Sequence, residues 1–265
     1  MSQSIRTAAF LLLGFVGPWA ARSTAEDVNE GAASAKKLNV AVVTGGHPFN
    51  EPEFFKLFQG YDDIAYKSLP QKTGGELFDD VAAWPYDVIV LYNFNQTITP
   101  KQQENFLKLL DKGVGLVILH HANAAYNNWP LFWKIAGVEY HFKPWEKDGV
   151  KMEKSGYKGN VKFKVHVADP NHPVTRDLKD YAFLDETYCR TSVDPDVHAL
   201  LTTDEPSSDK TIGWVKTFGK SRVCYLQSGH DEKAYQDSNY RTLLARAIRW
   251  TAGKASVNNN TFHGR

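Results

Sequence analysis

Short apolar runs that end at glycine or at polar residues predict the strands of a buried sheet in the first half of the chain. These runs are LNVAVVTGG (residues 38–46), YDVIVLYNFN (86–95) and VGLVILHH (114–121). They are apolar on both faces, which is typical of parallel strands that helices cover on both sides. The pattern therefore predicts an α/β fold with a mostly parallel central sheet.

Four further segments have the apolar spacing and end signals of helices. They are EPEFFKLFQG (51–60), TITPKQQENFLKLLDKG (97–113), WPLFWKIAG (129–137) and SNYRTLLARAIRWTAG (238–253). In the second of these, Thr99 is the expected N-cap, Pro100 the first helical residue and Gly113 the closing residue. Asn50 and Ser238 are the expected caps of the first and last helices.

The second half of the chain is less regular. NVKFKVHVAD (160–169) alternates between apolar and polar residues, which predicts a strand with one wet face. TIGWVKTFGKSRVCYLQSGH (211–230) predicts a hairpin that turns near Gly219. No repeat or linker divides the chain, so we expect one domain over residues 38–253 and a disordered tail over 254–265.

The N-terminal residues have the pattern of a secretory signal peptide. An Arg-containing start, a short apolar run and small residues before Glu26 predict cleavage after Ala25. Retention of this run as a membrane anchor is the alternative, although the run is short for a span. Residues 26–37 are expected to be a flexible leader. The predicted location is periplasmic or extracellular, where Cys189 and Cys224 could pair, but their spacing leaves pairing open.

Composition excludes several function classes. The chain has 265 residues, 42% hydrophobic and 23% charged, with a formal net charge of +1, which does not indicate a nucleic-acid partner. It has no P-loop and no G-x-G-x-x-G, so no nucleotide cofactor is expected, and it has no G-x-S-x-G elbow. The sequence does not indicate an oligomeric state.

Polar residues follow the predicted strands. Gly46 and His47, Asn93, His120 and His230 each stand at or after such a strand end. Ligands of open α/β sheets bind outside the carboxyl ends of the strands, so these residues could converge on one cleft. Taken singly, each histidine is more often structural. His121 is expected to point away from His120, because side chains alternate along a strand.

Two chemistries remain open for these residues. The adjacent carboxylates Asp185 and Glu186 could divide acid and base roles, or be ordinary solvated acids. His120 and His230 could act as acids, or, with His47, they could bind a divalent metal ion. The spacing is not that of a compact metal motif.

Six segments, in this order, resemble the motifs of the ThuA-like (trehalose utilisation) family. They are VVTGGHPF, GVGLVILHHA, HPVTRDL, LDETY, GWVKTFGKSRVCYLQSGH and YRTLLARAIRWTAG, and the resemblance runs from Leu38 to Gly253. It implies a flavodoxin-like, class I glutamine amidotransferase-like three-layer sandwich. LHHA stands where the amidotransferase nucleophile would be expected, so a thiol hydrolase that uses Cys189 or Cys224 is the weaker interpretation.

The resemblance also implies a small carbohydrate substrate, such as a disaccharide or a 3-keto-glycoside. The family's recurrent polar positions fall on His47, His120, His172, Asp185, Glu186, Tyr188 and His230. From these we predict catalysis by Asp185, Glu186, His230 and His120, with substrate contacts from Gly46, Asn93, Tyr188 and Trp145. Trp129, Trp133, Tyr140 and Trp145 could stack on a sugar or belong to the core. A non-catalytic sugar-binding protein with the same cleft is the alternative to an enzyme.

Overall fold

The computed structural model describes residues 36–254, which form one compact unit within Ala35–Arg265. The predicted signal peptide, most of the leader and nearly all of the tail lie outside these described residues. Within them, no helix is both long and apolar enough to cross a bilayer.

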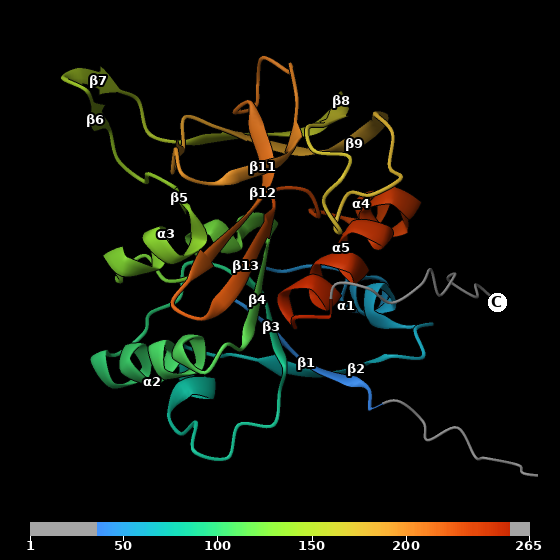
Figure 1. Cartoon of the computed structure of the whole chain (residues 1–265). Helices are drawn as coiled ribbons and strands as arrows, with labels where there is room; N and C mark the ends of the chain where they lie inside the picture. Colours follow the sequence, from blue (N-terminus) through green and yellow to red (C-terminus); the bar gives the residue numbers. More distant parts are fainter. Residues whose placement is uncertain (1–35, 255–265) are drawn as a thin grey trace, which may run out of the picture. The chain divides into compact units, whose positions relative to one another are not determined.

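A nine-stranded sheet forms the centre of the described unit (Figure 1). In spatial order its strands are β2 (Ile64–Pro70), β1 (Leu38–Gly45), β3 (Val88–Asn93), β4 (Gly115–Leu119), β13 (Ser221–Leu226), β12 (Thr211–Phe218), β11 (His198–Thr202), β8 (Gly156–Val167) and β9 (Tyr181–Cys189). The first five pair in parallel, and the last four extend the sheet by antiparallel pairing. The predicted α/β fold is confirmed.

Helices cover both faces of the parallel strands. The helices are α1 (Glu51–Phe55), α2 (Pro100–Asp111), α3 (Pro130–Ala136), α4 (Glu232–Gln236) and α5 (Ser238–Thr251). Two separate apolar clusters fill the layers, one with α1, α4 and α5 and the other with α2 and α3. β3 and β4 contribute residues to both clusters because every residue of these strands is buried. This two-sided burial explains why they are apolar without alternation.

Four smaller strands lie outside the large sheet. β5 (Val138–Glu139) pairs with β10 (Ser192–Val193), and β6 (Trp145–Lys147) pairs with β7 (Val150–Met152). Figure 1 shows the β6–β7 ribbon extending from the segment that follows α3. β5, β6 and β7 lie in the irregular stretch between α3 and β8, whereas β10 follows β9.

Local end signals determine where most helices begin. Thr99 Oγ accepts a hydrogen bond from the Gln102 amide at 3.3 Å, and Gln102 Oε1 accepts one from the Thr99 amide at 2.9 Å. This capping box confirms the predicted start of α2. The cap of α5 is Asp237 rather than Ser238, because the Asp237 carboxylate accepts the Asn239 and Tyr240 amides.

Several sequence predictions need correction. The first predicted helix is only α1, followed by a turn of 3-10 helix over Lys56–Phe58. The predictions missed β2, β9 and β11 and the short helix α4. The hairpin at Gly219 and the alternating burial of β8 are confirmed. Cys189 and Cys224 are free thiols, the first half-buried on β9 and the second buried on β13.

Candidate functional site

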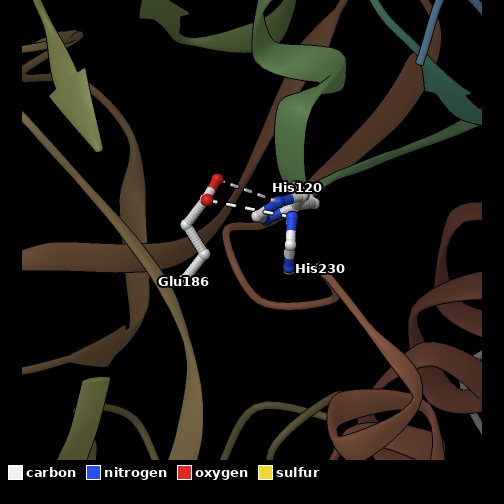
Figure 2. A group of neighbouring side chains, drawn as sticks. All are labelled: His120, Glu186 and His230. Atoms are coloured by element: carbon white, nitrogen blue, oxygen red, sulfur yellow. Dashed lines mark ion pairs between the residues drawn. The ribbon is translucent and has the colours of Figure 1, made fainter. Parts of the chain in front are cut away.

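Three side chains from separate segments of the chain meet at the carboxyl edge of the parallel strands: His120 directly follows β4, Glu186 lies on β9, and His230 lies in the loop after β13. The ligand atoms of His120, Glu186 and His230 all lie within 4.8 Å of one another. His120 Nε2 is 3.5 Å from Glu186 Oε1, and His230 Nε2 is 3.8 Å from Glu186 Oε2. Figure 2 shows the Glu186 carboxylate pointing at both imidazoles. We call this group the His–Glu–His triad.

His120 occupies a strained turn. It follows β4 directly, begins the 3-10 helix His120–Ala124, and has a φ of 50°, which is unusual for a residue other than glycine. Its side chain is fully buried, and its Nδ1 lies 2.8 Å from the carbonyl oxygen of Gln227. Since a carbonyl only accepts, Nδ1 carries a proton and donates it to Gln227, and Nε2 faces Glu186 and Tyr188. The strained turn and this hydrogen bond thus fix the orientation of the imidazole.

Glu186 is the carboxylate of the triad. It lies on β9 and its side chain is 11% exposed. Burial raises the pKa of Glu186, but the His120 hydrogen bond and the charges of His120 and His230 outweigh it, so the pKa lies below its ordinary value. The group is therefore a carboxylate at neutral pH.

Tyr188 completes the surroundings of His120. Its hydroxyl lies 2.9 Å from His120 Nε2, and burial raises the pKa of Tyr188 well above its ordinary value. The phenol therefore stays protonated at neutral pH and shares a hydrogen bond with the imidazole. The structure places Tyr188 in contact with His120, and its predicted role toward a substrate stays a prediction.

Asp185 contacts the backbone of the loop that carries His230, and its predicted catalytic role stays a prediction. It is 3% exposed, and its two oxygens accept the amides of Gly229 at 2.6 Å and His230 at 3.1 Å. Burial raises the pKa of Asp185, while these amide bonds act in the opposite direction. Because both oxygens are engaged with backbone, the geometry makes Asp185 a positioning residue for the loop that carries His230.

Two further histidines lie behind the triad. The rings of His47 and His121 have centroids 4.7 Å apart, and the His47 centroid is 6.2 Å from that of His230. His121 Nε2 lies 3.2 Å from the Tyr92 carbonyl oxygen. Burial lowers the pKa of both His47 and His121, so both are neutral at pH 7. His47 lies outside the group of ligand atoms within 4.8 Å of one another, which His120, Glu186 and His230 form, and the predicted metal set of His47, His120 and His230 stays a prediction.

Gly46, Asn93 and Trp145 are the other residues for which a substrate contact is predicted. Gly46 is exposed with a φ of 76°, and a side chain there would collide with the Phe94 carbonyl. Asn93 is fully buried and donates to Gln96 Oε1, so it supports the loop from beneath. Trp145 stacks on His141 with centroids 4.0 Å apart. Their predicted substrate contacts stay predictions for Gly46 and Trp145, whereas the burial of Asn93 argues against one.

His172 does not join the site. Its ring packs against Trp250 of α5 and against His198, with centroids 5.1 and 5.8 Å away. The rigid turn between two prolines places it near the end of α5, and no local sequence signal distinguishes that place from the site.

Comparison with known proteins identifies the family. The model of the ThuA family, described as trehalose utilisation, matches residues 71–251. The chain belongs to this family. That membership confirms the sequence resemblance and gives the protein a sugar-related role, in trehalose utilisation.

Solved structures with the same fold include other ThuA-like proteins. A putative ThuA-like protein from Parabacteroides merdae ATCC 43184 superposes with a TM-score of 0.69 at 19% identity, over 84% of this chain and 93% of that one. A second, from Bacteroides uniformis ATCC 8492, gives 0.57 at 21% identity, over 90% and 95%. A β-galactosidase from Bacillus circulans sp. alkalophilus gives 0.53 at 10% identity, over 84% and 32%. At these identities the likeness shows the fold alone, and it is consistent with the flavodoxin-like prediction. A search of the curated proteins gave no match.

Proposed function

We propose that this ThuA-family protein is a carbohydrate-active enzyme that processes a disaccharide or a 3-keto-glycoside at the His–Glu–His triad, assisted by a divalent metal ion. The observation that carries the proposal is the convergence of two imidazoles and one carboxylate within 4.8 Å at the edge where ligands of α/β sheets bind. Family membership supplies the substrate class.

The triad fits a divalent ion such as zinc. Two ligands bound tetrahedrally at zinc distances lie about 3.4 Å apart, close to the 3.5 and 3.8 Å that separate the Glu186 oxygens from His120 and His230. The bond from His120 Nδ1 to a backbone carbonyl is a usual second contact of a metal-binding histidine. Two histidines and one glutamate would leave a position open for substrate, and the Tyr188 hydroxyl would have to leave His120 Nε2.

The chain's own residues would hold and move the protons. When bound, the ion supplies Lewis acidity that polarises a substrate oxygen. In a 3-keto-glycoside the keto group acidifies the C2–H bond, and Glu186, ionised at neutral pH, can accept that proton. The C1–O bond then breaks, a C1=C2 double bond forms, and the departing oxygen takes a proton from solvent water. Water can reach this side of the triad, because the His230 side chain is 36% exposed, the most of the three.

The proposal is tested by product analysis with trehalose and 3-keto-trehalose. We expect product with the wild type and none with Glu186→Ala or His230→Ala, each checked for an intact fold by circular dichroism. His198→Ala is the matched control, since His198 is exposed and pairs with Asp169 away from the triad. Full turnover in both triad variants would refute the assignment. Saturable sugar binding without product from the wild type would instead favour the sugar-binding alternative.

We also propose that the enzyme is exported. The support is the signal-peptide pattern of residues 1–25. N-terminal sequencing of the protein recovered outside the cytoplasm should find Glu26 first, and an intact Met1 in the mature protein would contradict export by cleavage.

A further inference from the structure

Phe142 is an exposed aromatic residue that ring contacts through Tyr140 and Tyr188 connect to the proposed site. It is 44% exposed and follows β5 in the segment before the β6–β7 ribbon. A single exposed apolar side chain needs no explanation by itself. Phe142 differs because its ring is part of a continuous series of aromatic contacts that leads to the triad.

The series runs in both directions from Phe142. On one side its ring centroid is 5.1 Å from that of Tyr140, which lies 5.8 Å from Tyr188, the hydrogen-bond partner of His120. On the other side Phe142 lies 6.1 Å from Phe94, which is 6.0 Å from His47. The series therefore reaches a histidine of the site at both ends, His120 through Tyr188 and His47 through Phe94. We call Phe94, Tyr140 and Phe142 the aromatic wall.

We propose that the aromatic wall, and Phe142 above all, is the subsite on which a glucose-type pyranose ring of the substrate stacks. This inference rests on the proposed function and names the part of the substrate that binds next to the triad. A glucopyranose has mostly equatorial hydroxyls, so its faces present C–H groups. These carry partial positive charge and are attracted to the negative face of an aromatic ring.

The exposure of the aromatic wall and the polar groups of the triad favour a sugar ring as the occupant of this subsite. The wall is apolar and partly exposed, while the adjoining triad offers a carboxylate and an imidazole that can bond the ring's hydroxyls. Binding sites of this kind combine an aromatic surface with a few placed polar groups. The tryptophans considered from the sequence are less suited, since Trp129 is 5% exposed in the core and Trp145 already stacks on His141.

The test is calorimetric titration of the purified full chain with trehalose and with methyl α-D-glucopyranoside. The variants are Phe142→Ala, Phe142→Tyr, which keeps the ring, and Tyr86→Ala as control. Tyr86 packs on Trp84 just before β3, at the opposite end of that strand from the site. We expect Phe142→Ala to weaken binding of both sugars by about tenfold, which is about 1.4 kcal/mol. Phe142→Tyr and Tyr86→Ala should bind as the wild type does.

The outcomes separate this subsite from the proposed reaction. Equal affinities of the wild type and Phe142→Ala would overturn the subsite, even if the wild type forms product. Failure of the wild type to bind either sugar would also overturn it. Loss of binding in Phe142→Ala, retained in Phe142→Tyr, would support the subsite even if no product formed, and only the reaction would then be refuted.

Discussion

Replacing Tyr92 by Phe removes one hydroxyl that ties β3 to the loop carrying His230. The Tyr92 hydroxyl donates to the Gly229 carbonyl oxygen at 2.7 Å and lies 2.7 Å from the Tyr235 hydroxyl. Tyr92 is 1% exposed, and its ring stacks on Phe54 with centroids 4.3 Å apart. Phenylalanine preserves that packing, so the variant isolates the hydrogen bond.

The expected loss of stability in Tyr92→Phe depends on which hydrogen-bond partner is left unpaired. Tyr235 keeps a bond to the His230 carbonyl oxygen at 3.0 Å, whereas the buried Gly229 carbonyl loses its side-chain donor. Leaving one buried acceptor unpaired costs about 1–3 kcal/mol. For a domain of this size, about 2 kcal/mol lowers the Tm by roughly 4–8 °C.

Tyr240→Phe is the matched control. Tyr240 is also 1% exposed, but its hydroxyl has no hydrogen-bond partner among residues 36–254. Removing an unpaired buried hydroxyl removes a desolvation cost, so we expect an unchanged or higher Tm. Thermal and urea unfolding at pH 7, followed by circular dichroism, measure both variants. A loss in Tyr240→Phe as large as in Tyr92→Phe, or no loss in Tyr92→Phe, would refute the reasoning.

Two further predictions concern residues away from the site. Arg249 bonds Asp63 with both Nε and Nη2, at 2.7 and 2.8 Å, and its hydrogen bond holds the pKa of Asp63 below the ordinary 3.8. The pair therefore stabilises the fold above that pH and loses its contribution as the pH falls through the lowered pKa. Asp63→Asn should cost about 1 kcal/mol of unfolding free energy at pH 7, and the deficit should shrink as the pH falls through the lowered pKa of Asp63, as urea unfolding across pH would measure. Burial raises the pKa of the Cys224 thiol, so a thiol reagent should titrate Cys189 in the folded protein and Cys224 only in denaturant; reaction of both in the native state would contradict the structure.

Local patterns predicted the elements whose causes are local. The cap of α2 depends on Thr99 and Gln102, three residues apart, and the buried strands show as unbroken apolar runs. β2 was missed because only its first residue, Ile64, is buried, so the strand lacks that signal. Its place in the sheet depends on pairing with β1, which sequence spacing does not specify.

The site was predictable in part from the fold class. The order of strands in an α/β sheet brings their carboxyl ends together, so His47, His120 and His230 could be expected to lie close together, and the structure places the rings of His47 and His120 within 6.2 and 5.3 Å of that of His230. The choice between Asp185 and Glu186 could not be predicted from the sequence. Neighbours on a strand face opposite sides of the sheet, and only the register of β9 decides which of the two faces His120. Phe142 gave no sequence signal, since its role depends on contacts with Phe94 and Tyr140 that the fold alone creates.

Metal content of the purified protein tests the central claim most directly. Elemental mass spectrometry after loading with zinc and desalting should find one ion per chain in the wild type and in His198→Ala. His120→Ala and Glu186→Ala should each retain far less than one, because each removes a ligand of the triad. One ion per chain in all four proteins, or none in the zinc-loaded wild type, would contradict a metal ion held by His120, Glu186 and His230.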